Sequence, residues 1–387
     1  MVITARPVTG DGRTLAATVE VDDAVHDLWW EVTYPPTLQR SPASPTSPTS
    51  PTSAAGDVLV AATLLPAALG GHELRIEAPV SAQLVRGAAT VSEVFAIWAR
   101  RRQLETDAEP GYRRTRVQAA GTRVSGGGSG RVAAMFSAGV DSFHTVLRHR
   151  HRLDALVYVV GFDVRLGSPP LEGALARVRA AAAQLGLPLI EVRTNLRDVL
   201  DAYVPWDDLH GAALATVGLL LGDEFAEVLV PATHTYDDLY PLGSHPVVET
   251  LWSNGDVVLS NDGGGFDRAD KLAAIATMAA ARANVRVCFQ FVDGALNCGR
   301  CEKCVRTLVG ARIGGVAGAF DTLPDPGTVR LLARVLRTVP LHRATTWRWY
   351  RLRLRREVRD PLLRLAVSVA LWRWQWRRWW GRRRGGS

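Results

Sequence analysis

Short apolar runs alternate with helical stretches through the middle of the chain. The runs are Val132–Phe136, Leu156–Phe162, Leu189–Val192, Val228–Pro231 and Val257–Ser260. The stretches between them have apolar residues at helical spacing, and they are Ser142–His151, Leu171–Gly186, His210–Phe225 and Ala269–Arg282. Strands that alternate with helices predict a parallel sheet with crossover helices. We therefore expect an α/β domain over residues 131–320.

The first 124 residues have a different pattern, with strand-like runs and one clear helix. The predicted strands are Val2–Val8, Leu15–Val21, Leu28–Thr33, Leu74–Ala78 and Arg114–Ala119. Val91–Arg102 places Val94, Ile97 and Trp98 on one helical face. This mixture predicts a small N-terminal α+β domain over residues 1–124.

Two low-complexity segments lie within and just after these 124 residues. Residues 41–53 repeat Ser, Pro and Thr, a composition that cannot form a core, so we expect an extended loop. Residues 125–130 read SGGGSG and predict a flexible linker between the two domains.

Length and composition exclude disorder over the whole chain. The 387 residues allow two or three domains, and 47 % apolar and 22 % charged residues are ordinary for a globular protein. There is no run of about 18 apolar residues and no apolar segment after Met1, so we expect neither a transmembrane helix nor a secretory signal. These expectations favour a cytoplasmic protein.

The positive charge is concentrated at the C-terminus. Residues 341–387 hold fourteen arginines against Glu357 and Asp360, a net charge of +12. The whole chain carries +8, so residues 1–340 carry −4. Tryptophans are interleaved with the arginines: Trp347, Trp349, Trp372, Trp374, Trp376, Trp379 and Trp380. We expect residues 321–387 to form a helical basic tail.

Several partners suit such a tail. Tryptophan at a lipid interface with arginine toward anionic headgroups favours peripheral contact with a membrane surface. Docking on the chain itself or on a partner, nucleic-acid binding and a disordered tail are the alternatives.

The clearest chemical motif follows the first strand of the α/β domain. Val132–Phe136 leads into Ser137-Ala138-Gly139-Val140-Asp141-Ser142 and then a helix. A small-residue loop at a helix N-terminus presents backbone N–H groups and the positive end of the helix dipole to an anion. Asp141 fits such a site if it orients the loop or binds Mg²⁺. An ordinary Ser/Gly loop is the alternative.

This motif resembles the PP-loop of the N-type ATP pyrophosphatases, although Ala138 stands where that family usually has glycine. The resemblance implies a Rossmann-like fold, Mg²⁺ and ATP cleaved to AMP and pyrophosphate. It implies nucleotide contacts by residues 137–142 and, near the adenosine, by Phe162 and Asp163. Lys271 and Arg268, which begin a later helix, are candidate catalytic residues with Asp141, because a cation there can reach a polyphosphate. A solvated helix face is the alternative for these two cations, and a simple strand-end turn is the alternative for Phe162 and Asp163.

All four cysteines of the chain lie close together. Cys288, Cys298, Cys301 and Cys304 are spaced C-x9-C-x2-C-x2-C, which lets four thiolates converge on one ion. This set predicts a structural Zn²⁺ site, with an iron–sulfur cluster and free thiols as alternatives.

The two motifs together are similar to the 7-cyano-7-deazaguanine synthase family over residues 131–315, and to uncharacterised bacterial PP-loop proteins with an N-terminal domain. This resemblance implies a C–N bond-forming ligase that adenylates a small-molecule carboxylate or carbonyl oxygen. Ammonia or an amine then attacks the activated group. A tRNA-modifying or other nucleic-acid-modifying enzyme and a non-catalytic nucleotide-binding protein are the alternatives.

Polar residues after the strand Val228–Pro231 are candidates for the substrate pocket, because ligands bind beyond the carboxyl ends of parallel strands. They are His234, Tyr236, Asp237 and His245. Structural hydrogen bonding is the alternative role for each histidine. A homodimer is a further possibility that the sequence does not decide.

Overall fold

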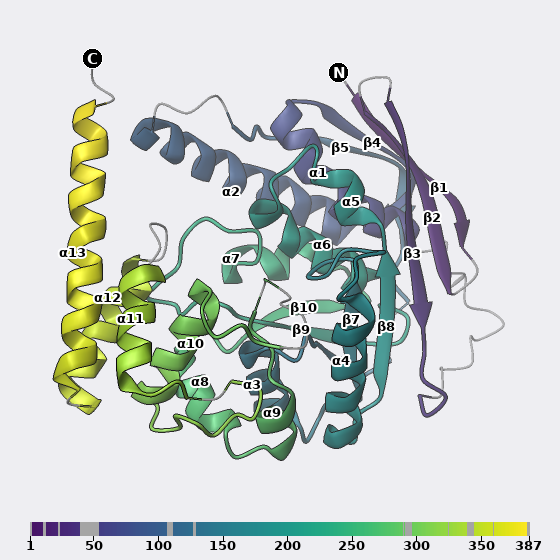
Figure 1. The fold of residues 1–387 in the computed structure, drawn as a ribbon. Coiled ribbons are helices and arrows are strands. Elements are labelled where there is room, and N and C mark those ends of the chain that lie inside the picture. Colours follow the sequence, from purple (N-terminus) through teal and green to yellow (C-terminus); the bar gives the residue numbers. More distant parts are fainter. Residues whose placement is uncertain are drawn as a thin grey trace. The chain divides into compact units, whose positions relative to one another are not determined.

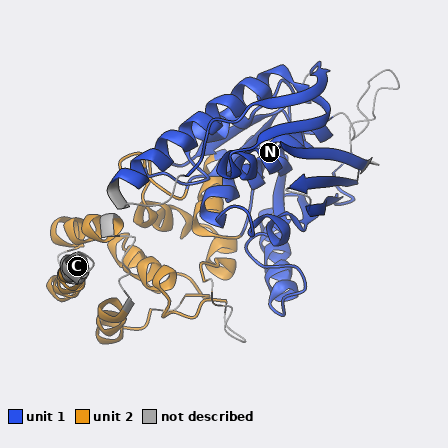
Figure 2. Cartoon of the chain, turned by 90° about the horizontal axis from the view of Figure 1, so that it is seen from above, with its two compact units in different colours: residues 1–137, 149–232, 239–264 blue, residues 138–148, 233–238, 265–387 orange. Residues whose placement is uncertain are grey.

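The computed structural model describes residues 2–10, 13–21, 24–38, 54–106, 111–126, 129–288, 290, 296–323, 325–338, 344–358 and 360–384. The loop predicted over residues 41–53 lies outside this set. The chain divides into two compact units (Figure 2). Unit 1 comprises residues 1–137, 149–232 and 239–264, and unit 2 comprises residues 138–148, 233–238 and 265–387.

Unit 1 is built on one ten-stranded sheet with the order β10-β9-β6-β7-β8-β3-β2-β1-β4-β5 (Figure 1). The strands are β1 Val2–Gly10, β2 Thr14–Val21, β3 Ala24–Thr33, β4 Glu73–Ser81, β5 Val117–Arg123, β6 Val132–Met135, β7 Ala155–Val160, β8 Leu189–Thr194, β9 Glu227–Pro231 and β10 Val258–Asp262. The five strands β6 to β10 are all parallel, and so are the pairs of β4 with β1 and β5. The expected α/β class with a mostly parallel sheet is confirmed.

The N-terminal strands continue this sheet. β3 pairs antiparallel with β8, placing Trp30 opposite Thr194 and Val32 opposite Val192. Trp30 is fully buried and its indole N–H donates to Thr216 Oγ1 at 3.1 Å. The compact units therefore do not follow the expected boundary at residue 124. Pairing with β3 covers the edge that β8 would otherwise expose, and strand patterns alone do not reveal this.

The helices of unit 1 include a long buried one that the sequence pattern did not predict. They are α1 Ala55–Gly70, α2 Ala82–Thr106, α4 Leu171–Leu185, α5 Leu196–Leu200, α6 Trp206–Leu220, α7 Pro246–Glu249 and the 3-10 turn η1 Thr250–Trp252. α1 is buried from Ala55 to Ala68 and packs on α6 and β4. A helix that is apolar on every side has no amphipathic periodicity, which is why the pattern missed it.

Unit 2 is helical in its described residues. It contains α3 Val140–His149 up to Arg148, α8 Arg268–Ile275, α9 Ala279–Asn284, α10 Glu302–Ile313, α11 Thr328–Thr338, α12 Ala344–Arg353, the π-helical turn η2 Leu354–Val358 and α13 Pro361–Arg384. The helix expected over Ala269–Arg282 is two helices, α8 and α9. Among the residues described, no helix combines the length and the apolarity needed to cross a membrane.

The basic tail packs against the rest of unit 2 along one face. Trp347, Tyr350 and Leu354 are fully buried, as are Leu363 and Val367 of α13. α13 packs on α11 and α12 (Figure 1). One face of α12 and one face of α13 are therefore buried within the chain, as one of the alternatives for the tail proposes.

Candidate functional site

The sheet topology marks one position for a ligand. The parallel strands run β8-β7-β6-β9-β10, so the strand order reverses between β6 and β9. In open α/β sheets, ligands bind beyond the carboxyl ends of the strands at this reversal. The segments that follow these two strands, residues 138–148 and 233–238, both belong to unit 2.

The loop after β6 is an irregular turn that ends where α3 begins. Ala138 is buried and has a φ of 55°, a left-handed conformation that glycine adopts freely and that costs an L-residue about 1–2 kcal/mol. Its carbonyl accepts a hydrogen bond from Arg286 N at 2.9 Å, and Ser142 Oγ donates to Gly139 O at 3.1 Å. Ser137 belongs to unit 1, whereas Ala138 to Ser142 belong to unit 2.

Asp141, in the first turn of α3, holds two cations from α8. Lys271 Nζ lies 3.0 Å from Asp141 Oδ1, and Arg268 Nη2 lies 3.1 Å from Asp141 Oδ2. Lys271 is 1 % exposed and Arg268 is 7 % exposed. Burial favours a raised pKa for Asp141, but the charges of Lys271 and Arg268 outweigh it and hold the pKa below its ordinary value. The carboxylate therefore remains charged, and the three predicted catalytic residues lie together.

The net charge of this cluster favours an anion. Two cations face one carboxylate, so the cluster carries +1, and the N-terminus of α3 adds the partial positive charge of the helix dipole. Lys303 of α10 adds a further positive field at Asp141. Such a site can neutralise a polyphosphate.

The position of α8 is set at its N-terminus. Asp267 caps the helix: its Oδ1 accepts from Ala269 N at 2.8 Å and from Asp270 N at 3.0 Å, and Asp270 completes a capping box. The cap residue immediately precedes Arg268, so it orients the turn that carries both cations.

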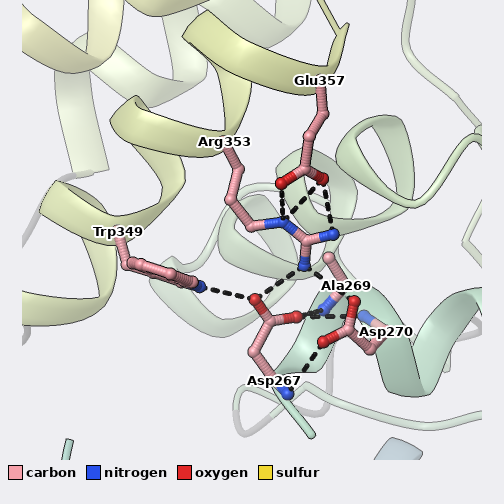
Figure 3. A network of polar contacts seen from close by, with 6 residues as sticks. All are labelled: Asp267, Ala269, Asp270, Trp349, Arg353 and Glu357. Atoms are coloured by element: carbon pink, nitrogen blue, oxygen red, sulfur yellow. Dashed lines mark hydrogen bonds and ion pairs between the residues drawn. The ribbon is translucent and has the colours of Figure 1, made fainter. Parts of the chain in front are cut away.

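A contact from the basic tail reinforces this cap (Figure 3). Trp349 Nε1 and Arg353 Nη1 both donate to Asp267 Oδ2 at 2.7 Å. Arg353 also donates to Asp270 Oδ1 at 2.9 Å and to Glu357 Oε2 at 2.7 Å. One guanidinium thus joins three carboxylates and ties α12 to the start of α8.

The four cysteines form a compact cluster that can hold a metal ion such as zinc. The sulfurs of Cys288, Cys298, Cys301 and Cys304 all lie within 4.8 Å of one another. The Cys288–Cys301 and Cys298–Cys304 sulfur pairs are each 3.9 Å apart. These separations exceed a disulfide bond, and they are close to the edge of a tetrahedron with Zn–S bonds of about 2.3 Å.

Hydrogen bonds orient the cysteines of this cluster. Cys301 N donates to Cys298 Sγ at 3.2 Å, and Gln290 N donates to Cys288 Sγ at 3.3 Å. Asn297 accepts from Cys288 N at 3.2 Å and donates to Val285 O at 3.0 Å. Such outer contacts orient metal ligands and favour thiolates.

The cysteine cluster is continuous with α10, because Cys301 is the N-cap residue of this helix and Cys304 lies in its first turn. Gly310 and Gly314 let neighbouring helices approach α10 closely. A Cβ on Gly310 would lie 2.9 Å from Tyr350 Oη, and one on Gly314 would lie 2.7 Å from Ala269 O. A metal that fixes the start of α10 would therefore also fix the packing of α8 and α12.

A pocket of about 260 Å³ opens among these elements of unit 2. Its walls include the 233–238 segment, Arg268 of α8, Arg306 of α10, and Trp349 and Tyr350 of α12. Tyr350 is fully buried, yet its hydroxyl has no hydrogen-bond partner among the described residues, and the same holds for Arg268 Nε. Unpaired buried donors beside a cavity are typical of a site that receives a polar ligand.

The predicted substrate residues divide between this pocket and other places. His234 and Asp237 line the pocket, whereas Tyr236 is 61 % exposed and is not among the lining residues. His245 lies in unit 1, where its Nδ1 accepts from Val247 N at 3.1 Å as the N-cap of α7. This hydrogen bond is of the structural kind that was the alternative for each histidine, and a substrate contact by His245 stays a prediction.

Phe162 and Asp163, predicted near the adenosine, also lie in unit 1. The Phe162 ring is buried and packs edge-on against Trp206 with a centroid distance of 5.1 Å. The Phe162 carbonyl accepts a hydrogen bond from Arg197, and Asp163 is exposed.

Sequence reasoning missed Asn297, Arg306, Trp349 and Tyr350 as residues of this region. Asn297 lies within the cysteine motif and Arg306 follows it on α10, which is a local signal, whereas Trp349 and Tyr350 lie on α12, which carries no ligand-binding motif. No protein-family model and no curated protein matches the chain.

Proposed function

We propose that this chain is an ATP-dependent adenylating enzyme that forms C–N bonds. It activates a carboxylate or carbonyl oxygen of a small molecule, releasing pyrophosphate, and ammonia or an amine then displaces AMP. One observation carries the proposal: Asp141 at the start of α3 holds the buried cations Arg268 and Lys271, an arrangement with a positive surplus suited to phosphate.

The loop conformation supports the same interpretation. Ala138 adopts the left-handed conformation at the position where PP-loop proteins usually have glycine. The strained turn leads directly into the helix N-terminus, and the reversal of strand order after β6 is the usual ligand position of doubly wound folds.

The reaction divides into two displacements. The substrate oxygen attacks the α-phosphorus of ATP, the bond between this phosphorus and the bridging oxygen breaks, and pyrophosphate leaves with the electron pair. Nitrogen then attacks the activated carbon, the C–O bond to AMP breaks, and the nitrogen loses a proton to solvent. Adenylation is needed because hydroxide is a much poorer leaving group than AMP.

In this proposal the chain contributes positioning and charge. Lys271 and Arg268 stabilise the charge that develops on the departing pyrophosphate, and Asp141 holds both cations in place. Both Asp141 oxygens already accept from these cations. We therefore assign Mg²⁺ to the phosphates of ATP, where it neutralises negative charge, as is common for this ion.

The remaining parts have supporting roles. The pocket lined by Arg306, Tyr350 and the 233–238 segment receives the small molecule, and its 260 Å³ suits a small ligand. Zn²⁺ held by the four cysteines would be structural, because four thiolate ligands would leave no open position for catalysis. The resemblance to the 7-cyano-7-deazaguanine synthase family is consistent with both assignments.

The test is nucleotide product analysis. Purified protein is incubated with Mg²⁺, ATP, ammonium and a small-molecule extract of the host, and AMP, ADP, pyrophosphate and phosphate are measured. We expect extract-dependent AMP and pyrophosphate from the wild type and at least a hundredfold less from Lys271→Ala. The control Arg177→Ala, at an exposed arginine on α4, retains wild-type turnover.

Three results would contradict the proposal. ADP and phosphate as products would exclude adenylation. Nucleotide binding without turnover across fractionated extracts would favour the non-catalytic alternative. AMP formed only when RNA is added would favour the nucleic-acid-modifying enzyme.

A further inference from the structure

The last described helix, α13, has an apolar face that no described part of the chain covers. Leu362, Leu365, Val369, Trp372 and Trp376 are 57 %, 60 %, 39 %, 62 % and 51 % exposed. Their spacing of three and four residues places them in one stripe along the helix. Trp372 and Trp376 stack with ring centroids 6.5 Å apart.

This exposed stripe is distinct from the face that packs within unit 2. Leu363, Ala366, Val367, Ala370, Leu371 and Trp374 are buried and form the opposite side of α13. α13 packs on α11, and Arg373 Nη1 donates to Leu336 O at 3.3 Å. The helix is thus held by one face and presents a second, apolar face outward. An exposed apolar patch of this kind marks an interaction surface.

The positive charge around the apolar stripe of α13 favours an anionic partner. Between Pro361 and Arg384 the chain has seven arginines and no acidic residue. Arg364 and Arg373 are exposed beside the stripe. Asp360, just before the helix, accepts from Leu363 N at 2.9 Å as its cap. A second copy of this helix would bring arginines against arginines, whereas an anionic surface complements them.

We propose that α13 binds the surface of an anionic membrane, lying along the interface with Leu365, Val369, Trp372 and Trp376 among the upper acyl chains. Tryptophan is favoured at this depth because its ring is apolar and its N–H is polar. Arg364 and Arg373 reach the headgroups. The helix lies on the membrane and does not cross it, in agreement with the lack of a membrane-spanning helix among the described residues.

The test is flotation of the full-length protein with vesicles. One set contains phosphatidylcholine alone, and the other contains phosphatidylcholine with about 30 % phosphatidylglycerol. We expect binding to the anionic vesicles at low salt, weaker binding at high salt, and at least tenfold weaker partition to phosphatidylcholine. Leu365→Gln/Trp372→Gln should reduce partition to the anionic vesicles at least tenfold.

Two further variants separate the apolar and charge contributions. Arg364→Gln/Arg373→Gln should weaken binding to the anionic vesicles about fivefold per arginine and leave binding to phosphatidylcholine unchanged. The control Val25→Gln/Val258→Gln removes exposed apolar side chains from β3 and β10 of unit 1 and should bind as the wild type does. Because all these positions are exposed, melting temperatures should change little.

Several outcomes would overturn the proposal. The first is flotation of the wild type with neither vesicle, and the second is flotation of the Leu365→Gln/Trp372→Gln variant as well as the wild type. A dimer in sedimentation velocity that this variant abolishes, without vesicle binding, would make a second copy the occupant of the stripe. Binding of a labelled single-stranded RNA without vesicle binding would make nucleic acid the partner.

Discussion

Replacing Asp141 by asparagine should destabilise the protein by about 3–5 kcal/mol at pH 7. The variant keeps the shape of the side chain but leaves the cations of Lys271 and Arg268, 3.0 and 3.1 Å from its oxygens, without their counter-charge. Removing one partner of a buried ion pair typically costs this much, because the remaining charge stays out of water. Lys271 is 1 % exposed and Arg268 is 7 % exposed, so both cations that would lose their partner are buried.

A second replacement tests whether charge is the cause. The double variant Asp141→Asn/Lys271→Met also removes one of the two cations that lose their partner, and it is compared with the single variants Asp141→Asn and Lys271→Met. The double variant should therefore be more stable than the sum of the single effects predicts, by about 1–3 kcal/mol. Urea unfolding followed by circular dichroism gives the free energy of unfolding of the wild type, the two single variants and the double variant. The control Asp321→Asn, at an exposed acid of unit 2, should change the free energy of unfolding by less than about 0.5 kcal/mol.

The effect should also depend on pH with a defined sign. The pKa of Asp141 is lowered in the folded protein, so its carboxylate stabilises the fold above the unfolded pKa of 3.8, and this stabilisation is lost as the pH falls below that value. The difference between wild type and Asp141→Asn should shrink by roughly 1 kcal/mol between pH 7 and pH 3. Equal differences at both pH values, or additive single effects, would refute the electrostatic explanation.

Three other predictions concern separate parts of the molecule. We expect elemental analysis to find one equivalent of zinc in the wild type and less in Cys301→Ser, because three thiolates hold the ion less tightly than four. Burial raises the pKa of Glu249 to about 7, so the folded protein binds the proton of this carboxyl group more tightly than the unfolded chain does. The free energy of unfolding should therefore fall by about 3 kcal/mol as the pH rises from 4.5 to 7. Glu249→Gln should remove this pH dependence in urea titrations. Arg353→Ala should lower the melting temperature, with a loss of about 1–3 kcal/mol, because Asp267 and Glu357 lose their charged partner.

Each of these predictions has a contrary result. Retention of a full equivalent of metal by Cys301→Ser would show that the cluster is not the metal site. An unchanged pH dependence in Glu249→Gln would assign the titration to another group. Arg351→Ala, an exposed neighbour in α12, is the control for Arg353→Ala, and equal melting temperatures of the two variants would mean that the α12 contact adds nothing to stability.

Local patterns in the sequence predicted much of the fold. The runs Val132–Phe136 and Val228–Pro231 are strands, and the helices near Leu171–Gly186 and His210–Phe225 are present within a few residues. The cysteine spacing predicted a metal cluster because neighbouring thiols need only local turns to converge. The α1 helix was missed because it is apolar on all sides and has no face to detect.

The chemical groups of this protein can be read from its sequence: a small-residue loop at a helix start, four thiols at metal spacing, and an arginine-rich tail with tryptophans. Which of these groups meet depends on the tertiary structure. Lys271 reaches Asp141 across 130 residues, and Arg353 reaches Asp267 across 86. β3 joins β8 in one sheet, and α13 presents a bare apolar face. The reason is physical: turns, caps and periodicity depend on neighbours a few residues away, whereas these contacts depend on how whole helices and strands bury their surfaces together.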